Sequence, residues 1–374
     1  MSVAKRMDLL GSETAFAVSA EAATLAATGK KIFPFHLGDI NLPTPATIVS
    51  AVKEAIKAGK TGYCPSPGIP ELREALGKDV GDSRGLNYGI DNVSIQPGGK
   101  PSIGKYIASM MEKGDVVLYP NPGFPIYESV IEFSGAQAIP IPLLEDRDFS
   151  FNADSVLSQI TPRTRLVILN SPANPTGGAV AKEEVDKLVA GLAEYPEVAV
   201  LSDEIYSRMC YDGHDHVSLL HYPEIRDRLI LLDGWSKTYA MTGWRLGYSV
   251  WPETLVDQAT RLAVNCHSCV NASAQYAGLA ALEGPQINVT QMVAAFDERR
   301  KVIVEGLNAL PGFRCRTPGG AFYAFPNIKG TGFDAKTLQN RLLEEVGVAT
   351  VCLLYTSDAA DEGLGVDLGG RRII

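Results

Sequence analysis

The sequence of 374 residues predicts an α/β protein in which helices cover both faces of a mostly parallel sheet. Short runs rich in Val, Ile and Leu are typical of strands that are buried on both faces. Longer segments with helical periodicity separate these runs, as in PSIGKYIASMMEKG, AKEEVDKLVAGLAEY and PETLVDQATRLAV. This alternation of strand and helix indicates parallel strand pairing. The expected strands are NVSIQ (92–96), DVVLY (115–119), RLVILN (165–170), VAVLS (198–202), LILLD (229–233) and RLGYSV (245–250).

The segments that follow these strands are unusually rich in glycine, proline or chargeable residues. Ligands of such sheets bind at the carboxyl ends of the strands, so these segments are the candidates for a functional site. In chain order they are PGGK (97–100), PNPGFP (120–125), SPANPTGG (171–178), DEIY (203–206) and GWSK (234–237).

The region after the sheet predicts a smaller second unit. Residues 286–309, ending DERRKVIVEGLNAL, suit a linking helix. The unit beyond it contains PGGAFYAFP (318–326) and LLEEVGVATV (342–351). The length agrees with one large and one small domain.

Composition and charge argue against several classes of protein. Hydrophobic content of 45% and charged content of 21% are those of an ordinary soluble globular protein. A net charge of −9 without a basic run argues against nucleic-acid binding. No apolar stretch reaches the roughly 20 residues of a membrane span, and the N-terminus lacks the apolar core of a signal peptide. We therefore expect a cytoplasmic protein with neither nucleic-acid nor membrane partners.

The cysteine and histidine residues do not predict a metal site. Cys266 and Cys269 form a C-x-x-C pair, but no second pair accompanies them to hold zinc, and we expect all six cysteines to be reduced. The triplet His214-Asp215-His216 could supply two ligands, yet it lies in a glycine-containing loop without acidic helpers. A surface turn is the expected structure there.

Glycines and cations suggest an anion site. Gly98, Gly99 and Lys100 begin a predicted helix, where backbone N–H groups and the helix dipole favour negative charge. Arg245 could bind phosphate oxygens through two parallel hydrogen bonds. The alternatives are a simple turn for the glycines and a surface ion pair for Arg245.

The stretch DGWSKTYAMTGWRLGY places Lys237 eight residues before that arginine. A desolvated lysine near another cation has a lowered pKa, and its neutral amine can form a Schiff base with an aldehyde. An aldehyde that carries a phosphate describes pyridoxal phosphate. Asp203 could face the ring nitrogen of this cofactor, or could instead be a helix N-cap. Phe124 could stack on the ring, while Asn174 and Tyr206 could hydrogen-bond its phenolic oxygen.

Six stretches together resemble the class I/II aminotransferases, which are fold-type I pyridoxal-phosphate enzymes of the aspartate aminotransferase superfamily. The resemblance implies a large domain with a seven-stranded sheet at 38–285, a small α+β domain at 286–351, and an N-terminal segment, 1–37, that contributes to the small domain. The matching stretches are YCPSPGIPELREAL (63–76), SIQPGGKPSI (94–103), YPNPGFPIYES (119–129), NSPANPTGG (170–178), SDEIYSRMCYDG (202–213) and DGWSKTYAMTGWRLGY (233–248).

The resemblance also implies a role for each site residue. Lys237 resembles the Schiff-base lysine that shuttles a proton during catalysis, and Asp203 the acid that keeps the ring nitrogen protonated. Tyr206, also a catalytic residue, and Asn174 match the ligands of the phenolic oxygen, and Phe124 matches the stacking aromatic. The residues that match the phosphate site are Gly98, Gly99, Lys100, Ser236 and Arg245.

Three further residues complete the expected site. Tyr63 resembles the tyrosine that reaches the phosphate of the other subunit, which implies a homodimer with shared active sites. Gly38, together with Asn174, resembles the residues that contact the substrate. Many relatives carry a hydroxyl residue where this chain has Gly234, so the phosphate site here is expected to have one donor fewer.

The resemblance stops after VGVATV. The family would continue with P-G-x-x-F-G and then an arginine, in a pattern such as IR-x-S, that binds the substrate carboxylate. This chain instead runs CLLYTSDAADEGLGVDLGGRRII, an acidic and glycine-rich segment. We expect residues 352–374 to be an artefactual tail and the small domain to be C-terminally incomplete. A chain of this kind would bind the cofactor yet transaminate poorly.

The expected activity is transfer of an amino group from an amino acid to a 2-oxo acid by a ping-pong mechanism, with pyridoxal phosphate as carrier. One alternative is a carbon–sulfur lyase or a cyclopropane-forming synthase on the same fold. A second is a transcription-regulating sensor, although residues 1–30 are too short for a DNA-binding domain. A third is a truncated, inactive product. Aspartate, alanine, aromatic and branched amino donors all remain open.

Overall fold

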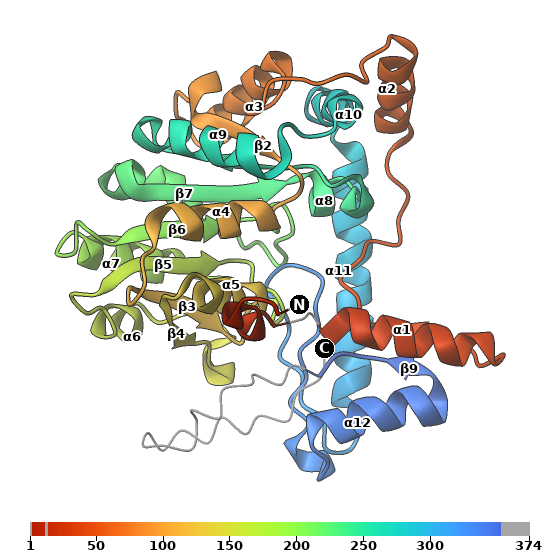
Figure 1. Cartoon of the computed structure of the whole chain (residues 1–374). Helices are drawn as coiled ribbons and strands as arrows, with labels where there is room; N and C mark the ends of the chain where they lie inside the picture. The colour runs from red at the N-terminus through yellow and green to blue at the C-terminus, as the bar shows by residue number, and fades with distance from the viewer. Residues whose placement is uncertain (1, 12–13, 353–374) are drawn as a thin grey trace.

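The computed structural model describes residues 2–11 and 14–352, so the tail expected at 352–374 lies outside the described residues except for Cys352. Its centre is a sheet in the order β2-β8-β7-β6-β5-β3-β4, in which only β8 is antiparallel to its neighbours (Figure 1). This confirms the predicted α/β class and the mostly parallel seven-stranded sheet. The strands are β2 (Val93–Gln96), β3 (Val116–Asn121), β4 (Gln137–Pro142), β5 (Thr164–Asn170), β6 (Ala199–Asp203), β7 (Leu229–Gly234) and β8 (Gly247–Val250).

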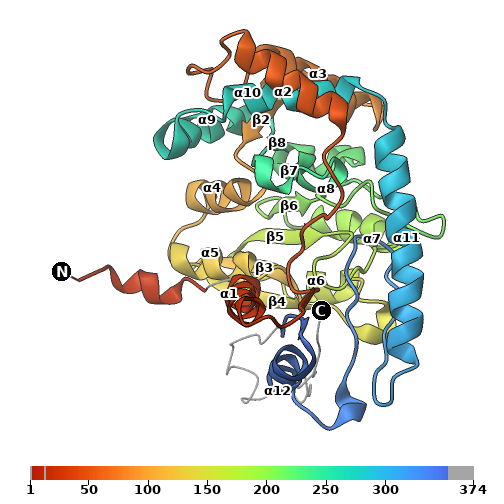
Figure 2. The same ribbon diagram turned by 90° about the vertical axis from the view of Figure 1, so that its right-hand side faces the viewer.

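Helices cover both faces of this sheet. Successive residues of β3 point to opposite faces, so Val116 and Leu118 belong to one hydrophobic core while Val117 and Tyr119 belong to the other. The helices of the first core are α3 (Pro70–Asp82), α6 (Ala153–Ser158), α7 (Lys182–Leu192) and α10 (Ala272–Glu283). Those of the second are α4 (Lys100–Met110), α5 (Ile126–Ser134) and α9 (Glu253–His267), with α4 and α5 on one side of the sheet and α6 and α7 on the other (Figure 2).

Local sequence explains where several helices begin. The side chain of Asn152 accepts a hydrogen bond from the Ser155 N–H at 2.9 Å and caps α6. Asn271 caps α10 in the same way. Pro70 stands at the first turn of α3, where its missing N–H removes no intrahelical bond.

The sequence did not predict β4. Its six residues, QAIPIP, include two prolines and only one buried side chain, Ile141. Proline is tolerated in an edge strand because one side of such a strand makes no ladder hydrogen bonds. The edge position of β4 in the sheet order therefore accounts for a strand without the apolar run of its neighbours.

The chain's two end regions meet beside the sheet. Strand β1 (Phe33–Pro34) pairs in parallel with β9 (Val348–Ala349). Helix α1 (Thr14–Ala27) packs Val18 and Ala22 against Leu343 and Ala349. Helix α12 (Ala335–Arg341) lies in the same lower part of the molecule (Figure 1).

One long helix runs between the sheet and the region of α12, and another helix packs at the opposite end. The predicted linking helix is α11 (Ile287–Asn308), which runs beside the sheet and down to the region of α12 (Figure 1). Helix α2 (Ala46–Lys57) packs on α10 at the opposite end. Within the described residues, no helix combines the length and the apolar character that crossing a membrane requires.

Candidate active site

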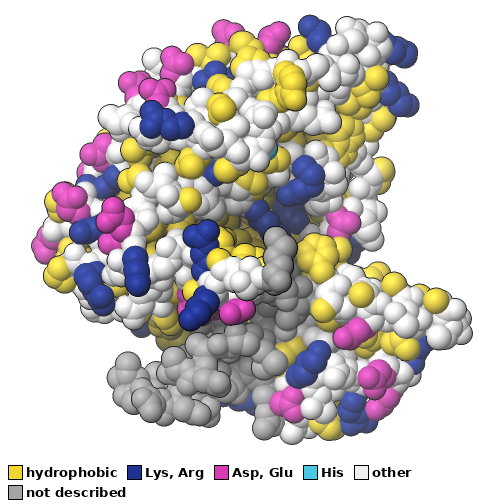
Figure 3. Space-filling view, viewed as in Figure 1, with side chains coloured by type: hydrophobic (Ala, Val, Ile, Leu, Met, Phe, Trp, Pro, Cys, Tyr) yellow, Lys and Arg dark blue, Asp and Glu magenta, His cyan; other side chains and the backbone are white. Residues whose placement is uncertain are grey.

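Parallel strands bring the predicted residues to one edge of the sheet. Strands β5 and β6 pair in register, with Asn170 opposite Asp203 at their carboxyl ends. Strand β7 ends at Gly234, and Lys237 follows in the short helix α8 (Trp235–Thr238). The viewed face is hollowed between the sheet and the region of α1, and Lys and Arg side chains gather along the hollow (Figure 3).

Asp203 is a buried carboxylate, with 5% of its surface exposed. Its hydrogen-bond donors are both neutral: the Tyr127 hydroxyl at 2.7 Å from Oδ2 and the Ile205 N–H at 3.3 Å from Oδ1. Burial raises the pKa of Asp203 to about 7, although these two hydrogen bonds oppose the shift. A cationic ligand beside this carboxylate would favour its charged form.

A short chain of hydrogen bonds joins Asn174 to the same strand end. The Asn174 N–H donates to Asn170 Oδ1 at 2.8 Å, and Asn170 Nδ2 donates to the Asp203 carbonyl at 3.0 Å. The predicted ligand segments after β5 and β6 are therefore bonded to each other.

Lys237 lies where the large-domain strands face the N-terminal segment. Its Nζ donates to the carbonyl of Gly38 at 2.5 Å and sits 5.2 Å from the ring centroid of Phe322. The structure thus brings together Lys237 and Gly38, two residues that the sequence predicted for catalysis and for substrate contact.

At the predicted anion site, the exposed Arg245 lies against the backbone of Gly98. Gly98 has φ +92°, and a Cβ built there would lie 2.2 Å from Arg245 Nη2. The left-handed φ favours glycine, and any larger residue would require this guanidinium to move. Arg245 Nη1 donates to the Thr242 carbonyl at 2.8 Å, and Lys100 begins α4 with its ammonium 5.4 Å from the Phe124 ring centroid.

An aromatic cluster surrounds Tyr206. Its hydroxyl is hydrogen-bonded to that of Tyr323 at 2.5 Å, and its ring packs edge-on against Phe322. A Cβ at Gly38 would lie 2.8 Å from Tyr323 Oη, so this glycine admits the tyrosine. Burial and the neighbouring Tyr323 raise the pKa of Tyr206 well above its usual value.

Sequence reasoning missed Tyr127, Phe322 and Tyr323. Tyr127 stands three residues after Phe124, and the two rings pack edge to face at 5.7 Å. Phe322 and Tyr323 belong to PGGAFYAFP in the second unit, far along the chain from the strand exits. Both stretches were visible as motifs, but no local pattern indicates that their aromatic side chains reach Asp203 and Tyr206.

Three other predicted residues have distinct environments. Ser236 is buried, whereas Tyr63 is 94% exposed. Gly234 pairs with Gly247 between β7 and β8, and a Cβ at Gly234 would lie 2.7 Å from the Gly247 Cα. The close approach of these two strands explains why glycine stands here instead of a hydroxyl residue.

The expected surface turn at His214-Asp215-His216 is exposed at its first two residues. His216 turns inward, and its Nε2 is 2.8 Å from Glu204 Oε2. Among the described residues, no group of three or more His, Cys, Asp or Glu side chains could hold a metal ion.

These residues fit pyridoxal phosphate. A buried acid with only neutral donors suits a protonated ring nitrogen, and a guanidinium held against a glycine suits a phosphate. Phe124 supplies an aromatic face beside Tyr127, and Lys237 supplies an amine beside Gly38. The fold and the candidate site suit a transferase of the pyridoxal-phosphate type.

Comparison with known proteins identifies the family. The family of class I and II aminotransferases matches residues 30–357, and the chain belongs to it. The chain is 35% identical to an aspartate aminotransferase of Geobacillus stearothermophilus over 94% of this chain and 91% of that protein. It is 38% identical to a probable aspartate aminotransferase of Methanocaldococcus jannaschii over 84% of each. The predicted aminotransferase activity is confirmed at the level of the family, and the lyase or synthase alternative is not favoured.

Solved structures agree. The crystal structure of the aspartate aminotransferase of Rhizobium meliloti has a TM-score of 0.89 at 31% identity, covering 94% of this chain and 90% of that one. The aspartate aminotransferase of Thermus thermophilus with maleate has a TM-score of 0.89 at 30% identity, covering 94% and 91%.

Proposed function

We propose that this aminotransferase binds pyridoxal phosphate at the edge formed by β5, β6 and β7 and uses aspartate as an amino donor. The observation that carries the proposal is the carboxylate of Asp203. It is buried and, among the described residues, receives hydrogen bonds only from neutral donors, at the end of the strand that pairs with the one leading to Lys237. A cationic ring nitrogen would give this carboxylate the charged partner that the described part of the chain does not supply.

Each predicted residue has a place in holding the cofactor. Arg245, Ser236 and the backbone of Gly98, Gly99 and Lys100 would bind the phosphate, since a guanidinium and a helix N-terminus both favour an anion. Phe124 would lie against the ring. Asn174 and Tyr206 would donate hydrogen bonds to the phenolic oxygen.

When bound, the cofactor supplies an aldehyde that accepts the amino group and a protonated ring that withdraws electrons from the reacting carbon. Asp203 would hold the proton on the ring nitrogen. Lys237 Nζ would take the proton from the substrate α-carbon, because an amine beside an aromatic ring and a carbonyl can act as a general base once it is neutral. Tyr206, held by Tyr323, would orient the phenolic side of the ring.

The relatives support aspartate as donor. Both curated relatives described above are named aspartate aminotransferases or probable ones. The Thermus thermophilus structure contains maleate, a dicarboxylate. By analogy, the substrates proposed for this chain are a dicarboxylic amino acid and a 2-oxo acid, and the ping-pong order and cytoplasmic location stay predictions.

A homodimer with shared active sites is part of the proposal. Tyr63 is 94% exposed and Ile56 is 54% exposed, although both are large side chains with apolar surface. They line an open pocket of about 740 Å³ together with Trp244 and Val270. Packing a second copy on this face would bury apolar surface and let Tyr63 reach the partner's phosphate site.

Absorbance spectroscopy tests the cofactor and the donor together. Purified protein should show a visible absorbance band that is lost in Lys237→Ala and that shifts on adding aspartate more than on adding alanine or leucine. A protein without the band after incubation with pyridoxal phosphate would refute cofactor binding. Release of pyruvate and ammonia without a 2-oxo acid acceptor would instead support the lyase.

Subunit hybrids test the shared site. Tyr63→Phe chains, weakened by the loss of one hydrogen bond, should gain activity when mixed with inactive Lys237→Ala chains, because one of the two hybrid sites would have both native residues. A monomeric protein in light scattering, or a mixture as inactive as its components, would argue against shared sites.

A further inference from the structure

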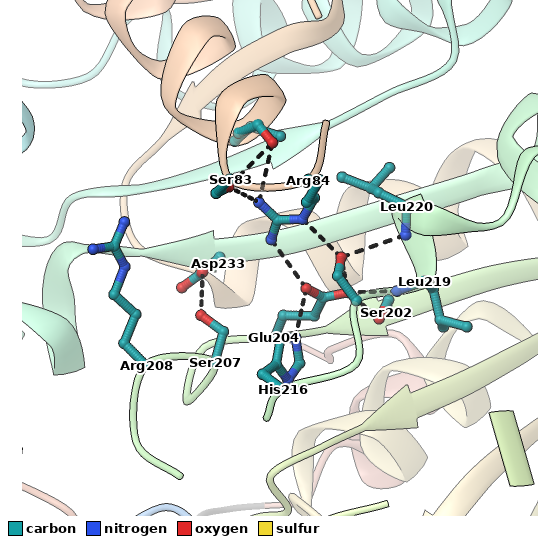
Figure 4. Close-up of polar contacts among 12 residues, drawn as sticks. Ser83, Arg84, Ser202, Glu204, Ser207, Arg208, His216, Leu219, Leu220 and Asp233 are labelled. Carbon is teal, nitrogen blue, oxygen red and sulfur yellow. Dashed lines mark hydrogen bonds and ion pairs between the residues drawn. The ribbon is translucent and has the colours of Figure 1, made fainter. Parts of the chain in front are cut away.

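Glu204 directly follows Asp203 but points away from the proposed cofactor site. Alternation along the strand sends Ser202 and Glu204 to one face and Asp203 to the other. The Ser202 hydroxyl donates to Glu204 Oε1 at 2.9 Å, while the Asp203 carboxylate meets Tyr127. Figure 4 shows Glu204 among side chains that come from several separate segments.

The Glu204 carboxylate is fully enclosed by donors, with 1% of the residue exposed. Oε2 receives Arg84 Nη2 at 3.2 Å and lies 2.8 Å from His216 Nε2. Oε1 is held by the hydroxyls of Ser202 at 2.9 Å and Ser218 at 3.0 Å and by the Leu219 N–H at 3.1 Å. A buried carboxylate is tolerated only with such pairing.

Glu204 is therefore ionised over a wider pH range than its neighbour Asp203. Burial opposes ionisation of Glu204, but the charge and hydrogen bond of His216 and the charge of Arg84 outweigh it and lower the pKa to about 2. Asp203, one residue earlier and equally enclosed, has its pKa raised to about 7. The difference arises because His216 and Arg84 outweigh burial at Glu204, whereas the neutral hydrogen bonds at Asp203 do not, and the charges of Asp233 and Glu204 add to its shift.

Arg84 extends the same cluster toward the strand that leads to Lys237. Its charge also acts on Asp233 in β7 and opposes the rise in the pKa of that buried acid, which burial raises to about 6. Asp233 Oδ1 accepts the Gly234 N–H at 2.6 Å, and Oδ2 accepts the Ser207 hydroxyl at 3.1 Å. The exits of β6 and β7 are thus joined behind the site.

Glu204 also belongs to the turn that carries Tyr206. Its carbonyl accepts the Ser207 N–H at 2.8 Å, and its N–H donates to the Leu232 carbonyl at 2.9 Å. The turn 203–206 is therefore fixed through both the backbone and the side chain of Glu204. A change in that side chain can move Asp203 and Tyr206 without contacting the cofactor.

We propose that Glu204, clamped by Arg84 and His216, is a positioning residue for transamination that fixes the Asp203 carboxylate and the Tyr206 hydroxyl. This rests on the proposed function, because those two groups are assigned to the cofactor ring. Arg84 and His216 act through Glu204 and are positioning residues as well.

Glu204→Gln tests the assignment, because glutamine keeps the size of the side chain but loses the charge that binds Arg84. We expect kcat per bound cofactor to fall at least tenfold, KM for aspartate to stay within twofold, and the visible absorbance band to shift. A purely structural role would lower stability and the folded fraction, but it would leave kcat per bound cofactor and the band unchanged. That second result would overturn the proposal.

Glu145→Gln is the matched control. Glu145 is also a largely buried carboxylate, paired with Arg314 Nε at 3.0 Å and Asn327 Nδ2 at 2.8 Å, but it follows the edge strand β4. The same substitution there should cost stability without changing kcat or the absorbance band. An equal loss of kcat in both variants would mean that the effect is not specific to Glu204.

His216 keeps the proposal testable if Glu204→Gln fails to fold. His216→Ala removes one donor from the partly exposed side of the cluster, and kcat should fall about threefold, with His216→Gln, a neutral donor, restoring part of the loss. Unchanged kcat in a folded His216→Ala protein would overturn the proposal that His216 positions Glu204. A wild-type protein without cofactor absorbance would refute the proposed function instead, whatever the variants do.

Discussion

Replacing Gly98 with alanine should weaken pyridoxal phosphate binding by more than the backbone strain of an alanine at a positive φ would cause. The new Cβ would lie 2.2 Å from Arg245 Nη2 and 2.9 Å from its Cζ, so the guanidinium must move. A charge-assisted contact of this kind is worth about 1.5–3 kcal/mol, which corresponds to roughly a 10- to 100-fold rise in Kd. Titrating the cofactor-free protein with pyridoxal phosphate, followed by absorbance, measures the change.

A second glycine separates the clash from the backbone strain. Gly29 has the same φ, +92°, but nothing lies within 4 Å of a Cβ built there. Gly29→Ala should therefore share the strain of about 1 kcal/mol that a left-handed residue pays. It should leave the Kd of the cofactor unchanged.

A variant of Arg245 tests whether the weaker cofactor binding of Gly98→Ala comes from displacement of the guanidinium. If alanine at position 98 acts by displacing the guanidinium, then Gly98→Ala combined with Arg245→Ala should bind no more weakly than Arg245→Ala alone. Additive losses in the double variant, or cofactor binding by Gly98→Ala as tight as in the wild type, would refute the reasoning.

Three further predictions follow from other contacts. Tyr127→Phe removes the hydroxyl that donates to Asp203, and kcat should fall by ~5-fold, the equivalent of about 1 kcal/mol. The loss of this donor should also raise the pKa of Asp203 in absorbance titrations, and an unchanged pKa would contradict the prediction. The pKa of Glu204 is lowered to about 2 from 4.5, so its stabilising effect is complete above pH 4.5 and is lost as pH falls through 2; urea unfolding should show a flatter acid limb in Glu204→Gln. Leu188→Ala, on the buried face of α7, should lower the unfolding free energy by about 2–5 kcal/mol, whereas kcat per folded molecule should not change.

The sequence predicted the sheet well because strands buried on both faces have unbroken apolar runs, which can be recognised locally. Strands such as RLVILN are apolar throughout, and the structure contains all six expected strands. The seventh, β4, has prolines and exposed residues because an edge strand needs neither an unbroken apolar run nor hydrogen bonds on both sides. The antiparallel direction of β8 was also hidden, since strand direction depends on the connections between elements and not on the strand itself.

Reasoning from the residues reached the candidate site where motifs follow the strands, whereas Gly38 and Tyr63 were expected only from the family resemblance. Asp203 and Lys237 end or follow β6 and β7, and parallel strands bring such ends together. Tyr127 and Tyr323 were missed because their contacts with Asp203 and Tyr206 join residues 76 and 117 positions apart. No local periodicity records a contact of that range.

The two neighbouring acids at the exit of β6 show how one turn can serve the fold and the ligand separately. Glu204 is paired with Arg84 and hydrogen-bonded to His216 inside the protein, so its charge stabilises the folded chain above pH 4.5. Asp203 has neutral donors, and burial raises its pKa from an ordinary 3.8 to about 7. Between these two pH values the carboxyl is protonated in the folded chain and ionised in the unfolded chain. The protein therefore loses stability from this group as pH rises from 3.8 to 7, by about 4 kcal/mol at the 1.36 kcal/mol of each pKa unit. A cation bound beside the ionised Asp203 would offset that cost. A protonated ring would therefore gain affinity from Asp203, provided that Glu204 keeps the turn in place.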